Sequence, residues 1–289
     1  MGWRISILGL VGIALVVPSV ACDDLALPAR PDDGGVTPTG DGGAPTGVVL
    51  PAYAPAGAIA GDVKQAMNST LATWVTLDTA GKVKDVNWNL PLTAVTSLDG
   101  APFDARVWMN FPPEAARDTA LTGFAYDWLS FGHFPNGIYD VGHWEFHMVV
   151  QDFADVQAID CQDPTLPAAE IVPSTYYVLP PPDNCFPGMG IHSIHLGAPE
   201  FQKERFTYSN MLVYYRTGKL KDVGTKLASM EPKVTTSFLK ERKSFTIALP
   251  ELPPGSIGRA TLVPTTLVAS YDSANDAFIF TAGGLVPGN

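Results

Sequence analysis

Four of the five histidines of this 289-residue chain lie in two short segments whose residue types could bind a metal ion. In the first segment, residues 142–150, polar and apolar residues alternate, which indicates a β-strand with two different faces. One face carries His143, Glu145 and His147, and its side chains could act as metal ligands or as acids and bases. The other face is an apolar stripe typical of a protein core, formed by Trp144, Phe146, Met148 and Val150.

Strand geometry limits how the polar face could hold an ion. At about 3.3 Å per residue, the Cα atoms of His143 and His147 lie about 13 Å apart. A mononuclear site would therefore use Glu145 with one of the two histidines, or would need a bulge in the strand. The spacing also differs from the His-Glu-x-x-His pattern of zinc proteases, so that chemistry is not predicted.

The second segment, residues 187–195, contains His192 and begins just after Cys185. In an oxidising compartment Cys185 is expected to pair with Cys161, which follows the first histidine segment. The bridge would close a loop of about 25 residues and contribute about 3 kcal/mol, less any stiffening of the loop by its prolines. Such a bridge would bring the two histidine segments together.

Two further residues are candidates for the same site. His133 lies in the turn before the first histidine strand, and Glu231 precedes Pro232 in a sequence that could deliver a carboxylate from a turn or form an ordinary solvated turn. Imidazole and carboxylate ligands suit zinc, iron, copper or manganese. The alternative is that the histidines are hydrogen-bonded in a buried polar layer or line a pocket without metal. The sequence therefore predicts a metal site drawn from His133, His143, Glu145, His147, His192 and Glu231.

The first 22 residues are predicted to be a bacterial export signal. Arg4 supplies the positive charge, residues 5–17 form an almost uninterrupted apolar run, and residues 19–21 are small, as signal peptidase requires. The apolar run is shorter than the about 20 residues needed to span a hydrocarbon core. The segment is therefore expected to be removed.

Cys22 stands directly after Ala21, where a bacterial lipoprotein carries its acylated cysteine. In bacterial lipoproteins the residue three before the acylated cysteine is usually leucine, and here it is Ser19. Ordinary secretion with a free Cys22 thiol is therefore the alternative.

Residues 23–55 are rich in Asp, Gly, Pro and Thr and cannot bury enough apolar surface to fold, so we predict a disordered tether. Residues 56–289 are predicted to form a single folded domain.

The charge of the chain restricts its partners. Loss of Arg4 with the signal changes the formal charge from −11 to −12, which disfavours nucleic acid because phosphates would be repelled. The expected location is the periplasm or the cell surface, with a membrane contact through the lipid anchor. Exposed strand edges could also let the domain assemble into a homo-oligomer. The sequence identifies no small-molecule ligand.

The hydrophobic pattern has mostly a period of two, which predicts an α+β domain that is mainly antiparallel β, a sandwich or barrel, with a few short helices. Strands are expected at 73–77, 83–88, 206–215, 266–271 and 277–281, with a turn at 217–218. Helices are expected at 61–71, 113–117 and 152–159.

Three stretches of the chain share an order and spacing of short motifs: 132–135 with 137–139 and 143–147, 189–192 with 199–201, and 231–235. Together they resemble a family of uncharacterised secreted bacterial proteins. That family carries a Gly-His-x-Pro turn, a His-Phe-Asp-x-His-Phe-Tyr strand, a Met-Gly-x-His segment and a Glu-Pro-Met-x-Thr segment. The likeness covers about residues 86–239.

The resemblance implies that His133, His143, His147, His192 and Glu231 belong together. The chain departs from the family pattern at three places and keeps all four histidines: Glu145 replaces Asp, Met148 and Val149 replace an aromatic pair, and Lys233 replaces Met. The activity of the family is not established, so the resemblance implies a site and no reaction.

Two functional hypotheses follow. The first is a metal-binding protein of the cell envelope, which would be a metal-dependent enzyme if the ion keeps an open coordination position. The second is a non-enzymatic, ligand-binding or self-assembling scaffold lipoprotein whose histidines orient a pocket or an interface. Metal content separates the two.

Overall fold

The computed structural model describes residues 49–133, 135, 137–163, 165–180, 184–216 and 224–288. The predicted signal, Cys22, most of the predicted tether and the predicted turn at 217–218 lie outside these residues. Tyr53 falls within the range predicted as tether, yet its hydroxyl accepts a hydrogen bond from Asn89 Nδ2 at 2.5 Å. The packed part of the chain therefore begins before residue 56. No helix of the described ranges is long and apolar enough to span a membrane.

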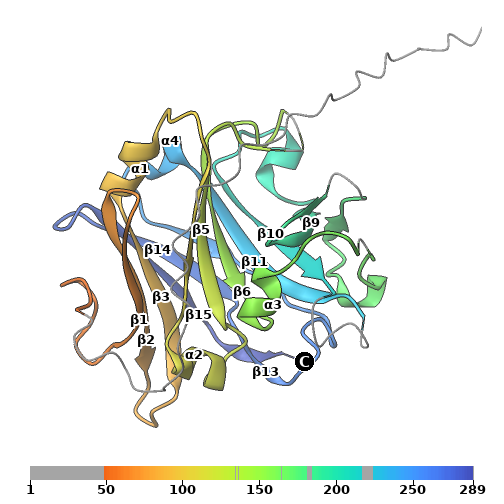
Figure 1. Cartoon of the computed structure of the whole chain (residues 1–289), viewed down its shortest axis with the longest axis horizontal. Coiled ribbons are helices and arrows are strands. Elements are labelled where there is room, and N and C mark those ends of the chain that lie inside the picture. Colours follow the sequence, from red (N-terminus) through yellow and green to blue (C-terminus); the bar gives the residue numbers. More distant parts are fainter. Residues whose placement is uncertain are drawn as a thin grey trace, which may run out of the picture. The chain divides into compact units, whose positions relative to one another are not determined.

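Two antiparallel β-sheets account for most of the described chain (Figure 1). One has six strands in the order β1-β2-β3-β15-β14-β12. The other has eight, in the order β4-β5-β6-β11-β10-β9-β7, with β8 paired to β9. Both sheets are open, so the described residues form a sandwich and no closed barrel. The predicted class, mainly antiparallel β with a few short helices, is confirmed.

The six-stranded sheet consists of β1 (Ile59–Ala66), β2 (Ser69–Leu77), β3 (Val83–Pro91), β12 (Phe245–Ala248), β14 (Thr266–Asp272) and β15 (Ala277–Gly283). The eight-stranded sheet consists of β4 (Ala105–Met109), β5 (Gly123–Leu129), β6 (His143–Val149), β7 (Tyr176–Val178), β8 (Cys185–Phe186), β9 (Gly190–His195), β10 (Tyr208–Tyr215) and β11 (Lys226–Thr235). A separate pair is formed by β13 (Thr261–Val263) and β16 (Val286–Gly288).

Short helices connect these strands. The α-helices are α1 (Leu92–Leu98), α2 (Pro113–Asp118), α3 (Phe153–Gln157) and α4 (Thr236–Leu239), and the 3₁₀ helices are η1 (Ala169–Ile171) and η2 (Pro199–Gln202). The predicted helices at 113–117 and 152–159 are confirmed as α2 and α3. In α3 the side chain of Asp152 accepts hydrogen bonds from the first-turn amides of Ala154 and Asp155, which fixes where the helix begins.

The helix predicted at 61–71 is wrong. This stretch forms β1, a tight turn and the start of β2. Met67 and Asn68 both have positive φ angles, 52° and 56°, as two-residue turns of β-hairpins require. The glycine usual in such turns is absent here, so no local signal indicated a turn.

The hydrophobic core lies between the two sheets. Trp88 of β3 stacks on Phe280 of β15 with ring centroids 5.6 Å apart, and Phe146 of β6 lies 4.5 Å from the Phe280 ring. The apolar stripe of the histidine strand, including Trp144 and Met148, belongs to this core, as predicted. Since side chains alternate along a strand, the polar face of β6 points away from the core, onto the outer face of the eight-stranded sheet.

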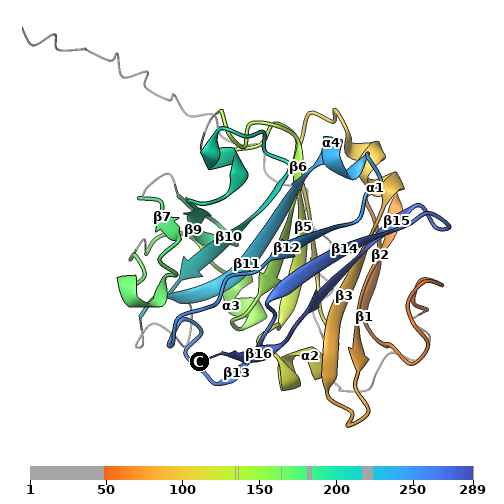
Figure 2. The same ribbon diagram turned by 180° about the vertical axis from the view of Figure 1, so that it is seen from behind.

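β6 and β11 run side by side through the middle of the eight-stranded sheet (Figures 1 and 2). The chain between β6 and β10 carries α3, η1, β7, β8, β9 and η2. Side chains of this connection contact the outer face of the sheet: Phe186 packs against His192 and lies near His133, and Glu200 bonds Tyr139. The polar face of β6 is therefore covered, and its residues are buried.

Candidate metal centre

A row of buried charges crosses four neighbouring strands. Strand register pairs Arg106 of β4 with Asp127 of β5, Asp127 with Glu145 of β6, and Glu145 with Lys233 of β11. Directly paired residues share one face of a sheet, about 5 Å apart. Arg106 binds Asp127 through Nε at 2.9 Å and through Nη2, and Lys233 Nζ donates to Glu145 Oε1 at 2.7 Å. The row therefore places two carboxylates between two cations.

A second row of polar side chains lies next to the first, two residues away along β6 and β11. His147 follows Glu145 on the same face of β6, and Glu231 precedes Lys233 on the same face of β11. His147 Nδ1 lies 3.3 Å from Glu231 Oε2. The predicted solvated turn at Glu231 is wrong, because Glu231 is fully buried within β11.

Pro232 explains why this part of β11 is unusual. The ladder between β11 and β6 is interrupted between the pairs Met230–Met148 and Lys233–Glu145, and proline has no N–H to donate to the neighbouring strand. The strand continues because its other neighbour, β10, still pairs through residue 232. A proline that would suggest a turn thus lies inside a central strand, beside the cluster.

His192 reaches the cluster from β9. Its Nε2 lies 3.0 Å from Glu231 Oε2, and its Nδ1 donates to the carbonyl of Gly190 at 3.1 Å. The adjoining strand β8 carries Cys185, whose predicted disulfide with Cys161 is confirmed, with Cα atoms 5.8 Å apart.

The disulfide holds a cover over the histidines. Phe186 follows Cys185 in β8, and its ring lies 5.0 Å from that of His192 and 6.2 Å from that of His133, measured between centroids. Removing the bridge would release one end of this cover while leaving β9 paired to β10.

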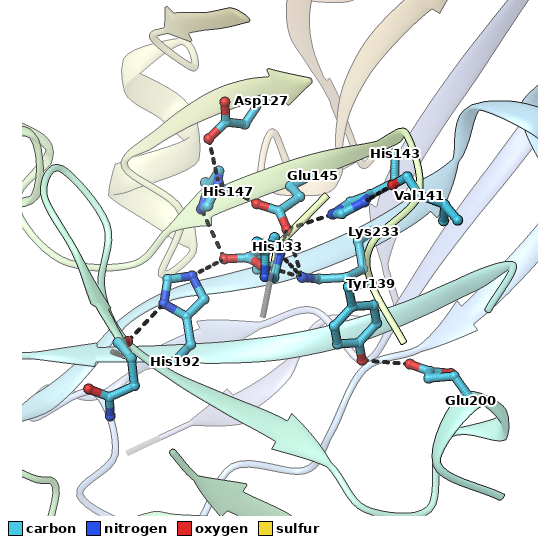
Figure 3. Close-up of polar contacts among 12 residues, drawn as sticks. Asp127, His133, Tyr139, Val141, His143, Glu145, His147, His192, Glu200 and Lys233 are labelled. Carbon is cyan, nitrogen blue, oxygen red and sulfur yellow. Dashed lines mark hydrogen bonds and ion pairs between the residues drawn. The ribbon is translucent and has the colours of Figure 1, made fainter. Parts of the chain in front are cut away.

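His133 and His143 approach Glu145 from the other side (Figure 3). His133 Nε2 lies 2.7 Å and His143 Nε2 3.1 Å from the same oxygen, Glu145 Oε1. His143 Nδ1 donates to the carbonyl of Val141 at 2.7 Å. Backbone carbonyls thus orient His143 and His192, the arrangement that commonly holds metal-binding imidazoles in place.

The structure brings all six sequence-predicted residues into one network of contacts. Four of the six, together with Asp127, form two groups of donor atoms, each with all atoms within 4.8 Å of one another: His133, His143 and Glu145, and Asp127, Glu145 and His147. His143 and His147 fall in different groups, consistent with the strand geometry. Glu145 belongs to both groups. Its Oε1 contacts His133 and His143 of the first group, and its Oε2 lies 3.6 Å from His147 Nε2 of the second. The described residues could hold a metal ion in either group.

Sequence reasoning missed three buried members of the network: Arg106, Asp127 and Lys233. Lys233 stands two residues after Glu231, so a strand interpretation of this segment would have placed both on one face. Asp127 is the single acid of the apolar strand β5, a sign of a paired buried charge. Its partner on β4 could not be inferred without the order of the strands.

Electrostatics favour a positive charge at His147. Burial lowers the pKa of this imidazole, but the carboxylates of Glu231, Asp127 and Glu145 outweigh burial and raise the pKa of His147 to about 9. For Glu231, burial and the charge of Glu145 raise the pKa, while Lys233, His192 and His147 lower it further, to about 2.

Lys233 and Glu145 stabilise each other's charged forms. Burial lowers the pKa of Lys233, yet Glu145 and Glu231 raise it above its ordinary value. Burial raises the pKa of Glu145, and Lys233 and His133 bring it well below its ordinary value. Burial and the Lys233 charge lower the pKa of His133. Glu145 and Lys233 are therefore charged at neutral pH, whereas His133 is neutral.

Hydrogen bonding leaves His147 unsatisfied. Among the described residues, neither ring nitrogen of His147 and neither oxygen of Glu231 has a partner with hydrogen-bond geometry. The contacts of Glu231 with His147, His192 and Lys233 are ion pairs. The distances from His147 to Asp127 and Glu145, 3.6 Å each, are ion-pair contacts. Buried polar atoms normally have partners, so such atoms suggest that a ligand or ion belongs between them.

Comparison of the chain with protein-family models, curated proteins and solved structures gives no match. The family resemblance inferred from motifs therefore stays a prediction, and the functional argument depends on the geometry of the cluster itself.

Access to the cluster is restricted. The side chain of His133 is 17% exposed, whereas those of His143, Glu145, His147 and Lys233 are at most 2% exposed. A small ion reaching Glu145 by way of His133 would pass beside Phe186. The arrangement can therefore hold a cation away from water, at donors that are already oriented.

Proposed function

We propose that this protein is an exported, lipid-anchored protein of the cell envelope that binds one divalent transition-metal ion through Asp127, Glu145 and His147. The observation that carries the proposal is the state of His147, a buried imidazole without a hydrogen-bond partner among the described residues and within 3.6 Å of three carboxylates. An ion between these groups would satisfy the nitrogen and neutralise the acids.

The donor spacing supports this choice. Ligands about 2.1 Å from a shared ion at tetrahedral angles lie about 3.4 Å from each other. His147 Nε2 lies 3.6 Å both from Asp127 Oδ2 and from Glu145 Oε2. Arg106 fixes the Asp127 carboxylate, and such outer partners orient metal ligands. One imidazole and two carboxylates suit zinc, iron or manganese.

The charge of the cluster also favours one ion. With neutral histidines, the carboxylates of Asp127, Glu145 and Glu231 face two cations, Arg106 and Lys233, which leaves one net negative charge. A proton on His147 neutralises it, and a divalent ion replacing that proton leaves one positive charge. A buried cluster tolerates either state better than a larger excess of charge.

Elemental analysis of the purified mature protein tests the proposal. We expect about one zinc, iron or manganese ion per chain, and about tenfold tighter binding per pH unit below pH 9, because the ion displaces the His147 proton. His147→Gln should abolish binding, and His195→Gln, which changes a histidine stacked on Tyr176, should not. Absence of stoichiometric metal, with a melting temperature unaffected by added zinc, iron, copper or manganese salts, would favour the scaffold hypothesis instead.

The export part of the proposal has its own test. Cys22 of the natural chain should incorporate a palmitate analogue during growth, and Cys22→Ala should abolish this labelling and release the protein from membranes. Labelling that persists in Cys22→Ala would contradict lipidation at this residue. The Cys161–Cys185 disulfide agrees with an oxidising compartment and supports export without identifying the anchor.

A further inference from the structure

The second donor group already contains a cation. Lys233 Nζ lies 2.7 Å from Glu145 Oε1 and 3.2 Å from His133 Nε2, which are two of the three donor atoms of the group formed by His133, His143 and Glu145. The ammonium also lies 3.0 Å from Glu231 Oε1 and 4.6 Å from the centre of the Tyr139 ring. Two carboxylates, an imidazole and an aromatic face thus surround it.

These surroundings resemble those of a bound ion more than those of an ordinary salt bridge. Lys233 is fully buried in the middle of a sheet. Three nitrogens lie within 3.1 Å of Glu145 Oε1, namely His133 Nε2, His143 Nε2 and Lys233 Nζ. Replacing the ammonium by an ion would keep the same donors, because lone pairs directed at a positive charge serve either cation.

We propose that the side chain of Lys233 occupies a second divalent-cation site, formed by His133, His143 and Glu145, and keeps metal out of it. The site for the first ion rests on the function proposed above, whereas the exclusion by Lys233 does not. Glu145 would bridge the two sites, with Oε1 in one and Oε2 in the other. Lys233 thereby sets the number of ions the cluster takes.

The charge of the cluster gives this exclusion a physical reason. A divalent ion beside the ammonium would meet a like charge about 3 Å away in a buried site, where repulsion is weakly screened. The ion would have to displace the lysine side chain, which is fully buried at the centre of the sheet. The ion is therefore directed to the His147 side of Glu145.

Lys233→Met tests the proposal, because methionine matches lysine up to Cε and vacates only the ammonium position. Zinc content after equilibration with zinc chloride should rise by about one ion per chain relative to the natural protein. The gain should disappear in Lys233→Met/His133→Ala. Lys226→Met is the matched control, because Lys226 lies on the same strand and donates to the carbonyl of Gly255, away from the cluster; its zinc content should not change.

The outcomes separate this inference from the function proposed above. Natural protein that binds none of zinc, iron and manganese would refute the first site, while a His133-dependent gain in Lys233→Met would still support the exclusion. No gain in Lys233→Met, or a gain that survives His133→Ala, would overturn the exclusion.

Folding of the variant is checked independently. Lys233→Met leaves Glu145 and Glu231 without their ammonium, so the measurement is repeated on Lys233→Met/Glu231→Gln, which restores the charge balance of the metal-free cluster. Circular dichroism confirms that each variant is folded. A His133-dependent zinc gain is expected in this double variant too, and its absence from a folded double variant counts against the proposal.

Discussion

Replacing His147, the residue whose charge changes near pH 9, should flatten the pH dependence of the free energy of unfolding. In the metal-free protein, the pKa of His147 is raised from an ordinary 6.5 to about 9 by surrounding carboxylates, against the opposing effect of burial. A folded-state pKa above the unfolded value means that the protonated imidazole stabilises the fold. This contribution is complete below pH 6.5 and is lost as the pH rises through 9.

The size of the effect follows from the pKa change. Each unit of pKa difference between the folded and unfolded states is worth about 1.4 kcal/mol. The natural protein should therefore lose about 3 kcal/mol of unfolding free energy between pH 6.5 and 9. His147→Gln is less stable at pH 6 but should lose little over the same range, because glutamine does not titrate.

Urea unfolding of chelator-treated protein at intervals from pH 6 to pH 10, followed by tryptophan fluorescence, measures this difference. His195→Gln provides the control, since His195 is outside the cluster, and its profile should follow that of the natural protein. Parallel profiles for the natural protein and His147→Gln would refute the assignment of a proton to His147 and the carboxylate field that holds it there.

Three further predictions concern the scaffold. Cys161→Ser/Cys185→Ser should lower the free energy of unfolding by about 3 kcal/mol, measured in urea against natural protein with and without reductant; equal stability would show that the bridge contributes nothing. Gly132→Ala should cost more than about 2 kcal/mol, because its Cβ would lie 1.6 Å from a carbonyl oxygen, whereas Gly137→Ala, with open space, should cost about 1 kcal/mol; similar melting temperatures would contradict this. Trp88→Ala should cost about 3–5 kcal/mol by chemical unfolding, and a loss below about 1 kcal/mol would place Trp88 outside the essential core.

Local patterns in the sequence were enough to predict β2, β3, β6, β10, β14 and β15 and the polar face of β6. The alternation around His143, Glu145 and His147 placed three cluster residues on one face, because side-chain direction in a strand depends only on position. The disulfide could be predicted because assigning Cys22 to a lipid anchor leaves two cysteines, which an oxidising compartment would pair. These predictions needed no knowledge of which strands are neighbours.

The parts that failed depend on long-range pairing. Glu145 and Lys233 are separated by 88 residues along the chain, and only the adjacency of β6 and β11 makes them partners. Pro232 suggested a turn because proline is rare in central strands. The strand nevertheless continues through Pro232 because it stays paired with β10. The chain at 61–71 formed a hairpin whose turn lacks glycine. The first two failures reflect tertiary structure that overrides a local preference, and the third reflects a local turn without its usual residue.

The polar cluster lies on the reverse side of the sheet that forms one wall of the apolar core. Loosening of β8 and Phe186 would therefore admit ions or water to the histidines without wetting Trp88 or Phe280. Opening of the histidine cluster and unfolding of the core would then be separate events, with separate rates.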